Sequence, residues 1–117
     1  MNSKASELNM KNSHFAVAHG MHHDDNYSSS YDMAFLSSHA MQDEKFREIV
    51  SQQSRECPSR NFIGHTYKWE NTNFLLKEGF DGVKTGITPT AGPCLSASIT
   101  KEGYRVIVVV LSCCSMD

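Results

Sequence analysis

The last third of the chain holds two strand patterns, and this pair constrains the fold more than any other feature. Residues 94–100 alternate strictly, with Leu95, Ala97 and Ile99 on one side and hydroxyl side chains on the other. Residues 104–112 enclose a continuous, largely β-branched apolar run at 106–111, which predicts a buried central strand. A Lys-Glu-Gly turn joins the two. We therefore expect antiparallel strands whose apolar face is buried and whose hydroxyl face is wetter.

Helical patterns precede these strands. Residues 2–10 predict a short helix, and residues 43–51 predict another that ends before Pro58. Between them, Ser29 and Asp32 have the spacing of a capping box, in which Ser29 begins a helix and Asp32 bonds back to it. Helices followed by an antiparallel sheet define an α+β fold.

Composition sets limits on the function. The chain has 117 residues, 39% of them hydrophobic and 21% charged, which suffices for one domain with a core. A net charge of −2 gives no basic surface for nucleic acid. The longest apolar run, residues 106–111, is too short to span a membrane, and no signal peptide is visible. No Cys-x-x-Cys pair occurs, so we expect the four cysteines to be free thiols.

A longer motif lies just before the two strands. Residues 82–88 read Gly-Val-Lys-Thr-Gly-Ile-Thr, and residues 91–95 read Ala-Gly-Pro-Cys-Leu. Lys-Thr-Gly is one signature of the β-lactamases and penicillin-binding proteins. Together with the flanking runs at residues 1–15, 27–34 and 69–76, the segment resembles the serine-type D-alanyl-D-alanine carboxypeptidases, a low-molecular-mass penicillin-binding protein family. The likeness runs in order from end to end, and it covers the C-terminal half of that family's catalytic domain.

The resemblance implies a fold and a set of roles. The fold would be part of the β-lactamase/penicillin-binding-protein transpeptidase-like fold, with no cofactor. Lys84 would be the catalytic residue, because it places positive charge beside a substrate carboxylate and the nucleophile. Thr85 and Thr88 would bind that carboxylate, Gly86 would admit the substrate backbone, and the Ile87 amide would be an oxyanion donor.

The family's nucleophile is not found in these residues. Its serine begins a Ser-x-x-Lys helix, and a Ser-x-Asn loop supplies further groups. The run at residues 98–101 spells Ser-x-x-Lys, but it ends a strand, where serine and lysine cannot share a helix face. The run at residues 59–61 spells Ser-x-Asn, but it lies too near Lys84 along the chain. We expect both matches to be fortuitous and the nucleophilic serine to be absent.

A metal site is a further alternative. His19, His22 and His23 stand beside Asp24 and Asp25, but their spacing fits no standard zinc pattern. We expect a solvated loop here and no metal.

Three readings remain. In the first, the chain is the substrate-binding part of a D-Ala-D-Ala carboxypeptidase, completed by a protein partner or a larger assembly. In the second, it is an inactive structural or interaction subunit on a truncated carboxypeptidase fold. The third, a β-lactamase relative, is less well matched by the flanking runs. In each, residues 1–117 form one partial domain, helical over 1–56 and sheet over 57–117, with no separate second domain. The compartment stays open.

Overall fold

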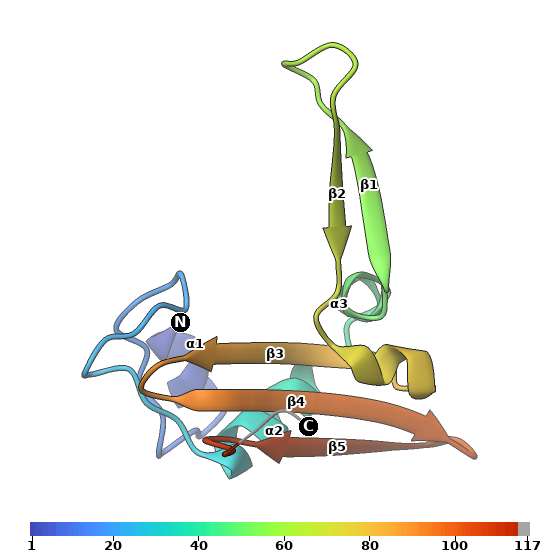
Figure 1. Ribbon diagram of the computed structural model, residues 1–117. Helices are drawn as coiled ribbons and strands as arrows, with labels where there is room; N and C mark the ends of the chain where they lie inside the picture. The colour runs from blue at the N-terminus through green and yellow to red at the C-terminus, as the bar shows by residue number, and fades with distance from the viewer. Residues whose placement is uncertain (115–117) are drawn as a thin grey trace.

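The computed structural model describes residues 1–114, which form a helical layer, a three-stranded sheet and a projecting hairpin (Figure 1). The helices are α1 (Asn2–Glu7), α2 (Ser30–Ala40) and α3 (Glu44–Val50). The hairpin pairs β1 (Ser54–Pro58) with β2 (Thr66–Glu70), and a 3-10 helix, η1 (Phe74–Glu78), follows it. The antiparallel sheet has the order β3 (Gly82–Thr88), β4 (Gly92–Lys101) and β5 (Tyr104–Val110). The α+β prediction is confirmed, although the first strand begins inside the range expected to be helical.

The helix starts follow the sequence. Ser29 is in an extended conformation, and its hydroxyl accepts the Asp32 backbone N–H at 3.2 Å, as predicted for the N-cap of α2. The reciprocal half of the capping box is wrong, because the buried Asp32 carboxylate accepts the Asn12 N–H at 2.8 Å and the Ser13 hydroxyl at 2.7 Å. Asp32 therefore ties the preceding loop to α2. Asp43 caps α3 by accepting the Phe46 N–H at 2.7 Å.

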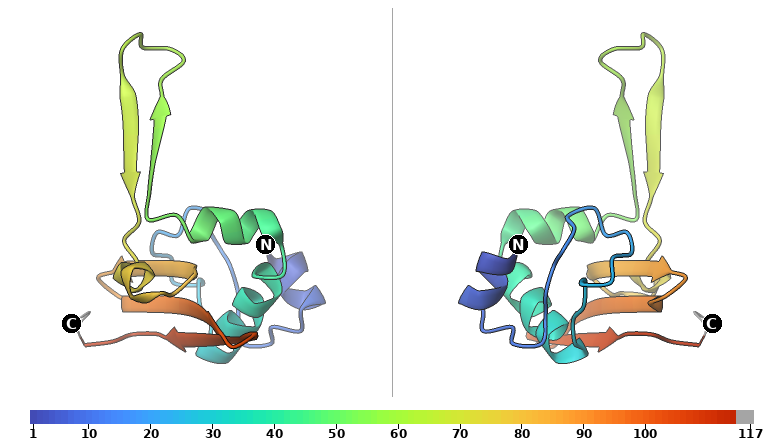
Figure 2. Two further views of the ribbon diagram at one scale, coloured as in Figure 1. Left: turned by 90° about the vertical axis from the view of Figure 1, so that its right-hand side faces the viewer. Right: turned by 90° about the vertical axis from the view of Figure 1, so that its left-hand side faces the viewer.

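The sheet buries the hydroxyl face of β4, which was expected to be wetter, together with Ala97 on its apolar face. Helix α2 packs against β4 and β5, and Figure 2 shows the helices on one side of the sheet. The contact is made through the hydroxyl face, where Ser37 and Ser96 are buried and share a hydrogen bond of 2.7 Å. Ser98 on the same face is fully buried. Small hydroxyl side chains that bond to each other let the helix approach closely, and alternation alone does not reveal this.

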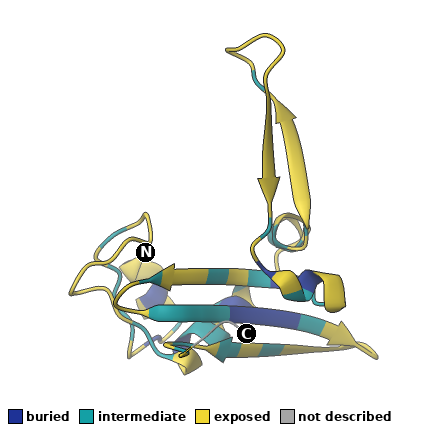
Figure 3. Ribbon diagram, in the orientation of Figure 1, coloured by how far each residue is buried: buried dark blue, intermediate teal, exposed yellow. Residues whose placement is uncertain are grey.

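The expected central position of residues 104–112 is also wrong in this chain. β5 is an edge strand, and Val106, Val108 and Val110 are 53%, 48% and 41% exposed. These valines share a face with Leu95 and the other apolar side chains of β4. Figure 3 shows the contrast between the buried middle of β4 and the exposed length of β5. The apolar pattern is that of a covered strand, yet nothing among the described residues covers it.

A polar cluster joins helix and sheet at the start of β3. Arg105 donates to the Met41 carbonyl at 2.8 Å and to the Asp81 carboxylate at 3.1 Å, and Thr100 donates to the same carboxylate at 2.9 Å. Burial alone would raise the pKa of Asp81, but the side chains of Ser98, Thr100 and Arg105 outweigh it and hold the pKa below its usual range. The ionised carboxylate is therefore the form that stabilises the fold.

The Asp81→Asn substitution tests this cluster. A depressed pKa contributes stability above the pKa of the unfolded chain, and that contribution is lost as pH falls through the folded value. We expect Asp81→Asn to lower the free energy of unfolding by about 1–2 kcal/mol at pH 7 and by much less near pH 2. Urea unfolding at both pH values measures this. The control is Glu78→Gln, an exposed carboxylate at the end of η1, which should change stability by less than about 0.5 kcal/mol. An equal loss at both pH values for Asp81→Asn would contradict the account.

Candidate functional site

The Lys-Thr-Gly segment lies on β3, at one edge of the sheet. Lys84 and Gly86 are exposed, and Ile87 is 70% exposed. Thr85 and Thr88 are half-buried. Because side chains alternate along a strand, Lys84, Gly86 and Thr88 share one face and Thr85 and Ile87 the other. The predicted site residues thus lie along one accessible strand but do not point to a single side of it.

Each polar side chain on β3 already has a partner. The Lys84 ammonium donates to the Thr85 carbonyl, and the Thr85 hydroxyl bonds to the Thr72 hydroxyl. Thr88 accepts the Ala91 N–H at 3.1 Å. These contacts are exposed, so a carboxylate ligand could replace them.

Gly86 provides the open space of the strand. A Cβ built at this position would meet no atom within 4 Å, so within this chain the residue has no steric need to be glycine. The space beside it is therefore available to a ligand that lies along the strand edge.

A bracket of three residues, Asn71, Thr72 and Asn73, holds β3 in place. The Asn71 amide donates to the Val50 and Gln52 carbonyls at 3.3 and 3.0 Å, which ties the bracket to the end of α3. The buried Asn73 amide donates to the Gly82 carbonyl at 2.9 Å, which ties it to the start of β3.

No function was predicted from the sequence for Asn71, Thr72 or Asn73. The available signal was the pair of asparagines just before the apolar run at residues 74–76, because asparagine side chains often bond to nearby backbone and cap short helices. Asn73 does cap η1, by accepting the Leu75 N–H at 3.2 Å.

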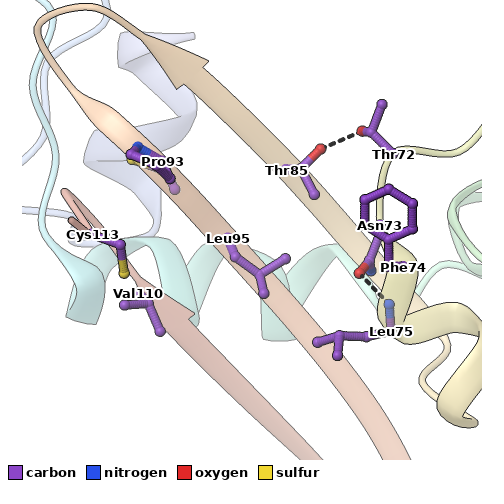
Figure 4. A pocket seen from close by; sticks show the side chains of 10 residues that line it. Thr72, Asn73, Phe74, Leu75, Thr85, Pro93, Leu95, Val110 and Cys113 are labelled. Atoms are coloured by element: carbon purple, nitrogen blue, oxygen red, sulfur yellow. Dashed lines mark hydrogen bonds between the residues drawn. The ribbon is translucent and has the colours of Figure 1, made fainter. Parts of the chain in front are cut away.

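A mostly apolar hollow of about 220 Å³ lies on the face of the sheet away from α2. Figure 4 shows Leu95, Val110 and Phe74 around it, with the Thr72–Thr85 contact at its border. The hollow continues the exposed apolar face of β5. It lacks the few convergent polar groups that orient a small ligand, so we interpret it as part of an uncovered packing surface.

The runs at residues 98–101 and 59–61, which spell Ser-x-x-Lys and Ser-x-Asn, lie where they cannot serve as catalytic motifs beside β3. Ser98 is fully buried in the middle of β4, where no substrate can reach it. The run at residues 59–61 belongs to the far end of the hairpin, away from β3 (Figure 1). Among residues 1–114, no group of three or more metal-binding side chains could hold an ion, and no helix is long and apolar enough to cross a bilayer.

Solved structures identify the class of fold. The chain superposes on the crystal structure of the Streptomyces K15 DD-transpeptidase with a TM-score of 0.87 and 35% identity, covering 94% of this chain and 44% of that one. A penicillin-binding protein homologue from Mycobacterium tuberculosis gives a TM-score of 0.83, and its 24% identity extends the likeness to the fold alone. The architecture is therefore that of part of a DD-peptidase domain.

The family follows from the sequence comparisons. The D-alanyl-D-alanine carboxypeptidase family model, Peptidase_S11, matches residues 1–114, and the chain belongs to this family. It is 40% identical to D-alanyl-D-alanine carboxypeptidase DacF of Bacillus subtilis, over 94% of this chain and 28% of that protein. It is 34% identical to the DacA enzyme of Escherichia coli, over 95% of this chain and 27% of that protein. The chain thus spans less than half the length of these relatives.

The Asn73→Ala substitution tests the bracket. The change removes the donor to the buried Gly82 carbonyl and the cap of η1, and we expect a loss of about 2–3 kcal/mol in the free energy of unfolding. Urea unfolding measures this loss. Hydrogen exchange should also show faster exchange of the β3 amides than of the amides in the middle of β4.

Two further variants sharpen this test. Asn73→Asp keeps an acceptor for the Leu75 N–H but loses the donor to Gly82, so it should remain clearly destabilised. Asn61→Ala, at the exposed tip of the hairpin, should change stability by less than about 0.5 kcal/mol. If Asn73→Ala behaved like Asn61→Ala, the bracket would not be what holds β3.

Proposed function

We propose that the chain is the substrate-binding part of a serine-type D-Ala-D-Ala carboxypeptidase, which hydrolyses the peptide of peptidoglycan through an acyl-enzyme. One observation carries the proposal. The Lys-Thr-Gly strand is an accessible sheet edge, with a cation at Lys84 and unoccupied space at Gly86. A peptide that ends in a carboxylate matches a strand edge that offers charge and hydroxyl donors.

Each residue type on β3 would have a different role in binding the substrate and in catalysis. Lys84 supplies a positive charge that attracts the terminal carboxylate and lowers the cost of ionising a neighbouring nucleophile. Thr85 and Thr88 supply hydroxyl donors once their present contacts yield to the ligand. The Ile87 N–H serves as an oxyanion donor, a role that backbone amides perform because they are fixed before the reaction begins.

The nucleophilic serine and its lysine come from outside these 117 residues. The exposed valines of β5 support this part of the proposal, because Val106, Val108 and Val110 continue the apolar face of β4 at Leu95 and form a pattern suited to burial. The unpaired edge of β5 is also suited to the addition of a strand. We propose that polypeptide from the same protein or from a partner covers this surface and completes the domain.

An inactive scaffold is the second candidate. The observation in its favour is the same uncovered surface, since an interaction subunit needs an apolar face but no nucleophile. In that case the strand edge at Lys84 would bind a partner's peptide without any covalent step.

Labelling with a fluorescent penicillin separates the two candidates. In the complete protein or complex, we expect a covalent label that maps outside residues 1–117 and that falls at least tenfold in rate with Lys84→Ala. Gly86→Ala should also slow labelling while leaving stability unchanged, because the added methyl fills only the ligand's space. Lys77→Ala, an exposed lysine on η1, is the matched control and should label normally.

Each other outcome has a definite meaning. A label attached to this chain would contradict the claim that it carries no nucleophile. Normal labelling of Lys84→Ala would remove the proposed role of Lys84. The absence of any label in the complete assembly would favour the scaffold.

A further inference from the structure

The loop before α2 reaches across to the end of the candidate strand. His22 Nδ1 lies 2.9 Å from the Thr90 hydroxyl, a contact between residues 68 apart in the sequence. Figure 1 shows this loop beside the end of the sheet where β3 passes into β4. The loop and the turn enclose an open hollow of about 300 Å³, whose lining includes His22, Asp24, Thr88 and Thr90. The histidine-rich loop, residues 19–26, therefore borders the candidate strand at its C-terminal end, beside Thr88.

The base of the loop is held independently of this contact. The Asn2 side chain donates to and accepts from the Phe15 backbone, at 3.0 and 2.8 Å. His14 and Tyr27 exchange two backbone hydrogen bonds, at 2.9 and 3.0 Å. A change at His22 should therefore alter the contact with Thr90 without releasing the whole loop.

The hydrogen bonds form a chain whose direction can be assigned. His22 Nε2 lies 3.1 Å from an Asp24 carboxylate oxygen, which can only accept. In the neutral imidazole the proton is therefore on Nε2, and Nδ1 must accept from the Thr90 hydroxyl. Thr88 then has the Thr90 oxygen, 3.4 Å away, as the acceptor for its own hydroxyl.

Protonation of His22 reverses this chain. Both ring nitrogens of the imidazolium donate, so Nδ1 donates to the Thr90 oxygen. The Thr90 hydroxyl is then free to donate to Thr88, which already accepts the Ala91 N–H at 3.1 Å. The Thr88 oxygen then accepts from both Thr90 and the Ala91 N–H, so the proton of the Thr88 hydroxyl has no acceptor among the described residues and can be donated to a ligand. The 3.4 Å link is the longest in the chain, so it is the one that a carboxylate would replace.

We propose that His22 is a positioning residue of the substrate site, which sets through Thr90 whether the Thr88 hydroxyl must give up an acceptor before it donates to the ligand carboxylate. This inference rests on the proposed function only for the identity of the ligand. The hydroxyl switch itself belongs to the free protein. Protonated His22 favours ligand binding because Thr88 then has no competing acceptor at Thr90, whereas with neutral His22 the ligand must displace that contact.

Other charged groups surround His22 and must be controlled. Asp24 contacts its Nε2, and on the same loop His23 lies 4.0 Å from the Asp25 carboxylate. From β3 and the turn after it come Thr88, Thr90 and Ala91, which line the shared hollow and are uncharged. His23→Asn is therefore the matched control, since it removes a neighbouring imidazole ring that makes no hydrogen bond to Thr90.

The first measurement needs no ligand. Nuclear magnetic resonance of the free protein, titrated from pH 8 to pH 5, follows the His22 ring and the amides of Thr88 and Ala91. We expect these amides to shift with the same midpoint as the ring, in the native chain and in His23→Asn. The shift should vanish in Thr90→Val, which loses the hydroxyl, and should return in Thr90→Ser. Amides that do not follow His22, or that still follow it in Thr90→Val, would overturn the proposal.

The second measurement adds N-acetyl-D-Ala-D-Ala by calorimetric titration to the complete protein, whose nucleophilic serine outside this chain is replaced by alanine in every variant so that the ligand is bound and not hydrolysed. Native protein and His23→Asn should bind about tenfold more tightly at pH 5.5 than at pH 8, the factor expected for one charge-assisted hydrogen bond. His22→Asn keeps a partner for Thr90 but cannot titrate, so its affinity should not depend on pH. The same pH dependence in His22→Asn would overturn the inference. Failure of the native protein to bind at either pH would contradict the proposed function, and the ligand-free titration would still decide the role of His22.

Discussion

The hydrogen bond from the Asn73 side-chain amide to the Gly82 carbonyl is the contact on which the rest of the site depends. It is buried, it spans 2.9 Å, and it joins the residue that caps η1 to the first residue of β3. An unpaired carbonyl in that place would cost about 1–3 kcal/mol, so the bond fixes both elements together. Its neighbour Asn71 extends the connection to α3, and Thr72 extends it to the middle of β3. The strand is therefore positioned from behind while its outer edge stays accessible.

The two ends of the same strand are held in different ways. Asp81 and Arg105 link the start of β3 to β5 and to the end of α2, and Thr88 and Thr90 link its other end to the loop at His22. Buried or half-buried contacts determine where β3 begins, and exposed hydroxyl contacts determine where it ends. This division is suited to a binding strand, since the ligand needs a rigid backbone but exchangeable side-chain partners.

Local features of the fold could be predicted from the sequence, and contacts between distant segments could not. Ser29 predicted the start of α2, because a hydroxyl just before a helical pattern can accept a backbone N–H from the first turn of that helix. Asp32 has the same local signal, but its carboxylate instead bonds to Asn12 and Ser13, which depends on how the loop folds back. The buried hydroxyl face of β4 was missed because Ser96 finds its partner on α2, 59 residues away.

The site shows the same limit. The Lys84-Thr85-Gly86 run was visible in the sequence, whereas the contacts of Thr72, Asn73 and His22 depend on how separate segments fold together. The valine-rich composition of β5 predicts a central strand, because strands of this composition are usually covered on both faces. Its exposure in this chain is the physical sign of a surface that another segment is expected to cover.

The most direct test of the account is a comparison of two ligands that differ only at the terminal carboxylate. Isotope-labelled chain in its complete assembly is titrated with N-acetyl-D-Ala-D-Ala and with the corresponding C-terminal amide, while the backbone signals of residues 84–88 are recorded. The account predicts saturable shifts centred on these residues with the carboxylate ligand and at least tenfold weaker binding of the amide. Equal binding of the two ligands, or shifts that lie elsewhere in the chain, would contradict it.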